Sequence, residues 1–195
     1  MLQGDARREA TGERAVEHCV GLFGAVDGLY HVAGGSGRNW GDGPLHECTL
    51  EGWNKTLELN LTSVMLSNRA ALRYWLKTGR SGSILNLGSV LGAYPAPQHF
   101  ATHAYAAAKS ALIGYSRSLA AYYGPHDIRV NVLLPALTET PMAERALHRE
   151  EVMDYVRQKQ VLDGGRAARP GDLTGAAAYF LSDQARFTTG QVLAV

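Results

Sequence analysis

The sequence predicts a single α/β domain in which a parallel sheet carries helices on both faces. Short apolar runs without polar alternation follow one another along the chain, separated by longer segments of helical periodicity. Strands that are buried on both faces have this continuous apolar character, which is typical of parallel sheets covered by helices. With 195 residues, 46% of them hydrophobic, the chain can bury one sizeable core. One domain over residues 1–195 is therefore expected.

Charge and cysteine content argue against several classes of partner. The chain has 19 Lys and Arg against 18 Asp and Glu, so its net charge of +1 predicts neither nucleic acid nor a membrane surface as a partner. No apolar run approaches a membrane span, and the N-terminus MLQGDARREATGER is too charged for a signal peptide. Cys19 and Cys48 lack metal-site spacing and are interpreted as reduced thiols. A cytoplasmic protein without a metal is expected.

The first elements in chain order are a helix, a strand and a second, long helix. Residues 8–23 place apolar side chains at helical spacing among charges, and residues 28–33, GLYHVA, form an apolar run typical of a buried strand. Thr49 is a suitable N-cap for a helix that extends to about Lys77. Asn60 lies within this helix, where asparagine is unfavourable, so either a specific hydrogen-bonding role or an exposed or capping amide is expected.

The segment GGSGRNWGDGP between that strand and the long helix is rich in glycine. Gly35, Gly37 and Gly41 after a strand resemble a loop that binds the phosphates of a dinucleotide. Such a loop opens directly into a helix whose N-terminus takes the pyrophosphate, whereas the Asp-Gly-Pro at 42–44 breaks any helix here. The segment is therefore interpreted as a loop that lines a cleft.

The next strand and helix combine groups that can transfer a proton. Residues 84–87 are an apolar run, Ser89 stands where this strand ends, and residues 104–121 form an Ala-rich helix. Tyr105 and Lys109 lie one turn apart on this helix and share a face. A lysine ammonium near a phenol favours the phenolate and lowers its pKa. The serine hydroxyl can hold a substrate oxygen while the tyrosine exchanges its proton.

The last third of the chain completes the alternation. A strand is predicted at 128–134, helices at 142–161 and 171–181, and a last strand from Gln191. Tyr155 and Lys159 repeat the spacing of the tyrosine–lysine pair, but their charged segment follows neither a strand nor a serine. This second pair is interpreted as an exposed helix face.

Taken in order, these segments resemble a short-chain dehydrogenase/reductase of the single-domain type, nearly from end to end. Asn60 in LELNLTS, Ser89 in ILNLGS, and Tyr105 with Lys109 stand where that family carries an Asn-Ser-Tyr-Lys tetrad. HVAG at 31–34 stands at the family's Asn-Asn-Ala-Gly, and RVNVLLPALTETPM resembles the strand and turn that hold the nicotinamide. GRAARPGDLTGAAAYFLSD and TTGQVLAV resemble the closing helix and strand. The resemblance implies a Rossmann-like sheet.

The resemblance also implies an NAD- or NADP-dependent oxidoreductase that interconverts a carbonyl and a secondary alcohol by hydride transfer. Tyr105 would be the acid/base and Ser89 would bind the substrate oxygen. Lys109 would hold the nicotinamide ribose and lower the pKa of Tyr105, while Asn60 would position a water that links Lys109 to solvent. The other implied cofactor contacts are Thr138 and Thr140 at the carboxamide, Pro135 in the adjoining turn, Ala33 and Gly34 at the adenosine ribose, and Asp5 at the adenine. A small carbonyl or alcohol is the implied substrate, its pocket bordered by Tyr94, His99, Phe100 and the 140–160 helix.

Three departures from the family pattern matter. His31 and Val32 replace two asparagines, so a polar tie in the sheet is expected to be missing or altered, and Ala136 replaces a glycine beside the nicotinamide. The family's glycine loop and its first three strands precede the part that residue 1 matches, so strands 1–3 are expected to be missing. The chain is thus interpreted as a fragment or the product of a shortened reading frame. A non-catalytic remnant that cannot bind the dinucleotide is the open alternative.

The resemblance finally implies an assembly. In the family, the helices that match residues 49–77 and 104–121 pack against their copies in a neighbouring subunit. The second of these helices carries small side chains that suit close approach, namely Ala106, Ala107, Ala108, Ala111, Ala120 and Ala121. A homodimer or homotetramer through these helices is expected.

Overall fold

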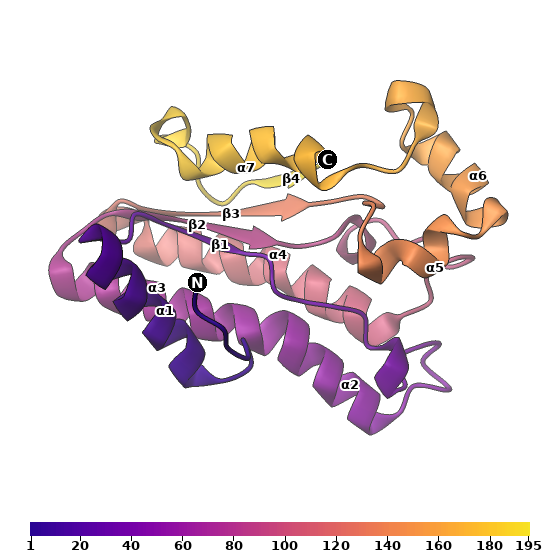
Figure 1. The fold of residues 1–195 in the computed structure, drawn as a ribbon, viewed down its shortest axis with the longest axis horizontal. Coiled ribbons are helices and arrows are strands. Elements are labelled where there is room, and N and C mark those ends of the chain that lie inside the picture. The colour runs from indigo at the N-terminus through magenta and orange to yellow at the C-terminus, as the bar shows by residue number, and fades with distance from the viewer.

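The computed structural model describes residues 1–195, and its four strands form one parallel sheet (Figure 1). The strands β1 (Gly28–His31), β2 (Gly82–Leu87), β3 (Ile128–Leu134) and β4 (Val192–Ala194) lie in the order β1-β2-β3-β4. The register pairs Ile84 with Val130 and Val132 with Val192. The predicted parallel sheet is confirmed, and β1 lies at one edge of it.

Helices cover both faces of the sheet, as predicted. They are α1 (Glu9–Phe23), α2 (Leu50–Leu57), α3 (Ser63–Thr78), α4 (His103–Tyr123), α5 (Glu144–Leu147), α6 (Glu150–Lys159) and α7 (Thr174–Leu181). Figure 1 shows α1, α3 and α4 on one face and α7 on the other, with α5 and α6 beyond the carboxyl ends of the strands. None of these helices combines the length and the hydropathy that crossing a membrane requires.

The larger part of the core lies between the sheet and the layer of α1, α3 and α4. Its buried members are Val26, Ala71, Leu72, Trp75, Ile84, Ala120, Ile128 and Val130. Trp75 is fully buried, and its indole Nε1 donates to the carbonyl oxygen of Val26 (2.7 Å), so the one polar atom of this side chain has a partner. This core fixes β2 and β3, whose ends carry the candidate site.

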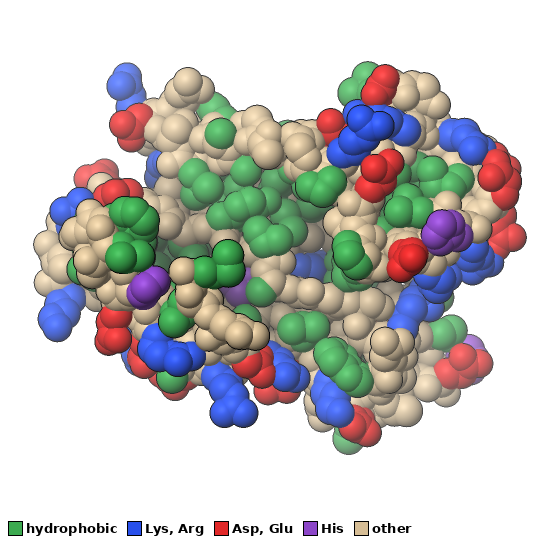
Figure 2. Space-filling model, in the orientation of Figure 1, with side chains coloured by type: hydrophobic (Ala, Val, Ile, Leu, Met, Phe, Trp, Pro, Cys, Tyr) green, Lys and Arg blue, Asp and Glu red, His purple; other side chains and the backbone are tan.

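A smaller cluster lies on the α7 face. Leu85, Leu133 and Phe180 are buried there, and Tyr30 and Leu87 are partly buried at its margin. Figure 2 shows hydrophobic side chains gathered in the middle of this view, near α7, with charged side chains around the rim. The face of the molecule seen in Figure 2 therefore leaves apolar side chains partly open to solvent.

The long helix predicted from Thr49 to Lys77 is interrupted once. Thr49 caps it as predicted, since its hydroxyl oxygen accepts from the backbone N–H of Gly52 (2.9 Å). A π-turn at Glu58–Thr62 separates α2 from α3. The interruption coincides with the buried side chain of Asn60, which bonds to Gly35 outside the helix. Single π-turns inside α-helices are frequent at functional sites.

The helix predicted at 142–161 is divided as well. Arg149 has extended backbone angles (φ −111°, ψ 110°), and α6 begins directly after it. The break lets Val152 and Val156 of α6 fold against Ala146 of α5 in a separate apolar cluster. Because this cluster joins residues across the break, the periodicity of either half alone does not reveal it.

The alanines of α4 do not all face outward. Ala108 and Ala120 are buried within the chain, so the prediction that they are available to a neighbouring subunit is wrong. Ala106 and Ala107 are half-buried, and the exposed members of the set are Ala111 and Ala121.

Candidate active site

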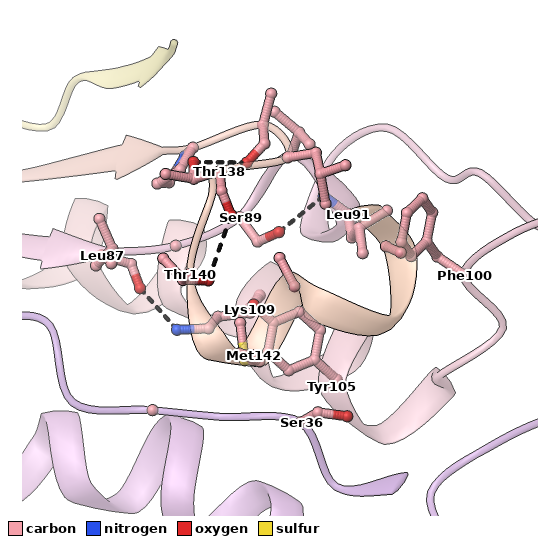
Figure 3. A pocket seen from close by; sticks show the side chains of 18 of the residues that line it. Ser36, Leu87, Ser89, Leu91, Phe100, Tyr105, Lys109, Thr138, Thr140 and Met142 are labelled. Atoms are coloured by element: carbon pink, nitrogen blue, oxygen red, sulfur yellow. Dashed lines mark hydrogen bonds between the residues drawn. The ribbon is translucent and has the colours of Figure 1, made fainter. Parts of the chain in front are cut away.

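The end of β2 brings Ser89 to the wall of a cavity. Ser89 caps a short 3₁₀ turn, Val90–Gly92, and its hydroxyl oxygen accepts from the backbone N–H of Leu91 (3.2 Å; Figure 3). A Cβ on Gly92 would lie 2.7 Å from the backbone of Lys109. Glycine therefore permits the close approach of this turn to α4, and that approach places Ser89 beside Tyr105.

Tyr105 and Lys109 lie in the first turns of α4 and line the same cavity. The ammonium Nζ of Lys109 donates to the carbonyl oxygen of Leu87 at the end of β2 (2.8 Å) and lies 5.7 Å from the centroid of the Tyr105 ring. Figure 3 shows both side chains below Ser89. Residues from two elements, β2 and α4, thus form one polar group on the cavity wall.

Asp42 fixes the beginning of α4. Its two carboxylate oxygens accept from the backbone N–H groups of Ala104 and Tyr105, each at 3.0 Å. An acidic side chain there satisfies N–H groups that a helix leaves without partners, and it complements the helix dipole. The sequence marks Asp42 only as part of a glycine-rich loop, so the connection across 62 residues could not be read from it.

Burial favours the neutral form of both titratable side chains. Lys109 is 3% exposed, and burial lowers the pKa of its ammonium to about 8. Burial also raises the pKa of the Tyr105 phenol, and the neighbouring Ser89 hydroxyl lowers it only in part. Burial of the phenol therefore dominates its pKa here, while the ammonium of Lys109 is directed at Leu87. The lowering of the Tyr105 pKa by Lys109, which the family resemblance implies, stays a prediction.

Asn60 is fully buried in the π-turn and bonds to the loop after β1. Its Nδ2 donates to the carbonyl oxygens of Gly35 (2.8 Å) and Thr56 (3.0 Å), and its Oδ1 accepts from the N–H of Gly35 (3.0 Å). A Cβ on Gly34 would lie 2.8 Å from Oδ1 of Asn60 and 3.4 Å from Nζ of Lys109. The predicted hydrogen-bonding role of Asn60 is confirmed, and the alternative interpretation as an exposed amide is wrong.

His31 provides a polar tie in place of the expected asparagine. Its ring nitrogens lie 2.7 Å from the Ser67 hydroxyl and 3.0 Å from the Ala33 carbonyl oxygen, which connects β1 to α3. Burial lowers the pKa of the ring to about 4, so the ring is neutral at pH 7. The polar tie in the sheet is therefore present in an altered form, with a histidine ring in place of an asparagine amide.

These side chains border a cavity of about 810 Å³. Of the predicted site and pocket residues, those that line it are Gly34, Ser89, Tyr94, Phe100, Tyr105, Lys109, Pro135, Thr138 and Thr140. Asp5, Ala33, Asn60 and His99 do not line it. The carboxylate of Asp5 is paired with Arg7 (2.8 Å), and this pairing lowers its pKa to about 2. Ala136, which replaces a glycine of the family pattern, also borders the cavity.

Tyr155 and Lys159 line the cavity as well. Tyr155 is half-buried, with its ring centroid 5.0 Å from that of His99. The prediction that this pair lies on an exposed helix face is therefore wrong for Tyr155. The physical reason is that α5 and α6 turn toward the cavity on the apolar cluster of Val152 and Val156 and carry Tyr155 with them.

A parallel sheet with serine, tyrosine and lysine at the carboxyl ends of its strands has the arrangement of an α/β oxidoreductase that works with a dinucleotide. A family model described as enoyl-(acyl carrier protein) reductase matches residues 1–195. The chain belongs to the short-chain dehydrogenase/reductase family. Dehydrogenases of this family use NAD or NADP.

Curated relatives and solved structures agree with this assignment. 2,5-Dichloro-2,5-cyclohexadiene-1,4-diol dehydrogenase of Sphingobium indicum is 33% identical over 191 residues, covering 97% of this chain and 73% of the relative. Cis-4-hydroxycyclohexanecarboxylate dehydrogenase of Sinomonas cyclohexanicum is 34% identical over 193 residues, covering 97% and 73%. A short-chain type dehydrogenase/reductase structure from Mycobacterium ulcerans has a TM-score of 0.87 and 28% identity, covering 98% of this chain and 66% of that one. The chain thus spans about two thirds to three quarters of their length.

Proposed function

We propose that the protein interconverts a carbonyl and a secondary alcohol with NAD or NADP, and that Tyr105 is the general acid/base. The observation that carries this proposal is the meeting of Ser89, Tyr105 and Lys109 on one cavity wall (Figure 3). The named relatives support it, because their names describe dehydrogenases of ring-borne alcohols.

Each of the three side chains has a chemical task. Burial keeps Tyr105 protonated at neutral pH, so it can donate its proton to a carbonyl oxygen during reduction. In alcohol oxidation the phenol first releases its proton to solvent, and the phenolate then accepts the proton of the alcohol. Ser89 holds the same oxygen by a hydrogen bond. Lys109 uses one N–H donor on Leu87 and keeps two for the hydroxyls of a ribose. The bound cofactor supplies or accepts the hydride.

The residues around this group fit the nicotinamide end of the cofactor. The absence of a Cβ on Gly34 lets its backbone lie close to Asn60 Oδ1 and Lys109 Nζ at the cavity wall. Thr138 and Thr140 border the cavity from the segment after Pro135, with hydroxyl groups that can face a carboxamide. The adenine contact of Asp5 stays a prediction, since its carboxylate is bound to Arg7 outside the cavity.

Replacing Tyr105 by phenylalanine tests the proposal. Loss of a general acid typically lowers rates about 10²–10⁴-fold, and we expect kcat/KM of Tyr105→Phe for cyclic secondary alcohols to fall within that range. Tyr122→Phe is the matched control, because Tyr122 is exposed on the same helix and lies outside the cavity. The assay follows reduced nicotinamide by absorbance. Equal activity of the two variants, or no oxidation of any alcohol by the wild type, would refute the proposal.

A further inference from the structure

The cavity wall carries charge of one sign only. Four of the 35 residues that line it are cationic, namely Arg38, Lys109, Arg145 and Lys159, and none is an aspartate or glutamate. The whole chain, in contrast, has 19 basic and 18 acidic residues. The cavity therefore concentrates positive charge that the chain as a whole does not have.

Three of these cations are not neutralised within the chain. Arg38, Arg145 and Lys159 form no ion pair, whereas arginines elsewhere do, as Arg69 does with Glu9 (2.6 Å). Asp42, the acidic neighbour of Arg38, already accepts two backbone hydrogen bonds at the start of α4. These cations are thus available to an anion that enters the cavity.

Arg38 and Arg145 come from segments far apart in the sequence and border the same cavity. Arg38 begins the 3₁₀ turn Arg38–Trp40 after β1, and Arg145 lies on α5. Partial burial and the charge of Arg145 lower the pKa of Arg38, the carboxylate of Asp42 raises it, and the charge of Arg149 lowers it. Two positive charges that border one cavity repel each other, and an anion bound in that cavity relieves this repulsion.

Two anions have the required chemistry, namely a charged group on the substrate and a phosphate of the dinucleotide. Arg145 stands on α5, where Ala146 packs against Phe100 in an apolar cluster. Met142 and Tyr94 add further apolar surface to the cavity wall. A charge next to an apolar wall suits a substrate with a hydrocarbon body and an anionic end, so the location favours the substrate.

We propose that the substrate is an alcohol or ketone with a carboxylate or similar anionic group several bonds from the reacting carbon, and that Arg38 and Arg145 bind this group. The proposal rests on the proposed function of Tyr105 in the same cavity. Lys159, which carries the third unpaired charge on the wall, adds to the attraction of an anion.

Two double variants that each remove two positive charges test whether Arg38 and Arg145 bind the anionic group of the substrate. Arg38→Gln/Arg145→Gln removes the proposed contacts, while Arg14→Gln/Arg186→Gln removes two exposed, unpaired arginines outside the cavity. The substrates are cis-4-hydroxycyclohexanecarboxylate and its methyl ester. We expect the ratio of kcat/KM for the acid to that for the ester to fall about 10–100-fold in the cavity variant, as loss of charge-assisted hydrogen bonds predicts. An unchanged ratio in that variant, or an equal fall in the control, overturns the proposal.

A binding measurement separates this proposal from the proposed function. Titration calorimetry with cyclohexanecarboxylate requires no turnover, and we expect affinity to fall about 10-fold or more in the cavity variant while affinity for NADH is kept. If this loss is seen but no alcohol is oxidised, the anion site stands and the proposed function fails. If NADH affinity falls instead of affinity for the acid, the arginines serve the cofactor and the proposal is overturned.

Discussion

Asn60 connects a helix to the loop that borders the cavity, so its removal is expected to destabilise both. Asn60→Ala deletes two hydrogen bonds to the backbone of Gly35 and one to the carbonyl oxygen of Thr56. Each hydrogen bond contributes about 0.5–1.5 kcal/mol, and a buried group that loses its partner costs about 1–3 kcal/mol. Three bonds at about 1 kcal/mol each give an expected loss of about 3 kcal/mol in the free energy of unfolding.

Urea unfolding followed by circular dichroism measures this loss. In a chain of this size a loss of 1 kcal/mol lowers Tm by about 2–4 °C, so Tm of Asn60→Ala is expected to fall by about 6–12 °C. Asn54→Ala is the matched control, because Asn54 is exposed on α2 and its side chain has no hydrogen bond in the structure; we expect a change within about 0.5 kcal/mol. If Asn60→Ala loses less than about 1 kcal/mol, the reasoning that its amide holds the loop is refuted.

Two further predictions concern pH and assembly. Burial lowers the pKa of His31 in the folded chain from 6.5 to about 4, so the unfolded chain binds more protons between these values and stability is lost as pH falls through that window. Between about pH 7.5 and about pH 4.5, wild type should lose about 2–3 kcal/mol more than His31→Asn in urea unfolding, and equal losses would contradict this role. The exposed Ala111 and Ala121 support a homodimer or homotetramer through α4. Light scattering at micromolar concentration should then give two or four times 21.0 kDa, and a monomer would count against the interface.

The parts of the site that depend on local sequence could be predicted. An apolar run ending at Ser89 specifies β2, and the spacing of Tyr105 and Lys109 places them on one face of α4. The parallel order of the strands then brings the end of β2 and the start of α4 to one edge of the sheet. These relations follow from periodicity and from the rules of parallel sheets.

The rest depends on contacts that periodicity does not encode. The helical spacing of Val152 and Val156 is typical of a buried face of α6. It does not show that this helix turns toward the cavity and brings Tyr155 with it. Asp42 could not be assigned because its partners, Ala104 and Tyr105, lie more than 60 residues away and are backbone groups without a sequence signature. The direction of the Tyr105 pKa shift likewise depends on how deeply the phenol is buried.

The π-turn at Glu58–Thr62 lies between α2 and α3. Its hydrogen bonds run from residue i to i+5, so it takes one residue more than an α-helical turn. Because the extra residue is fitted into one wider turn, the side chains of α2 and α3 keep the same phase on either side of it. Deletion of one residue here would leave a regular α-helix and keep Trp75 in the core, whereas the widened turn from which Asn60 reaches the backbone of Gly35 would be lost. This long helix can therefore be shortened by one residue at this turn without unpacking the core, and the cost falls on the loop beside the cavity.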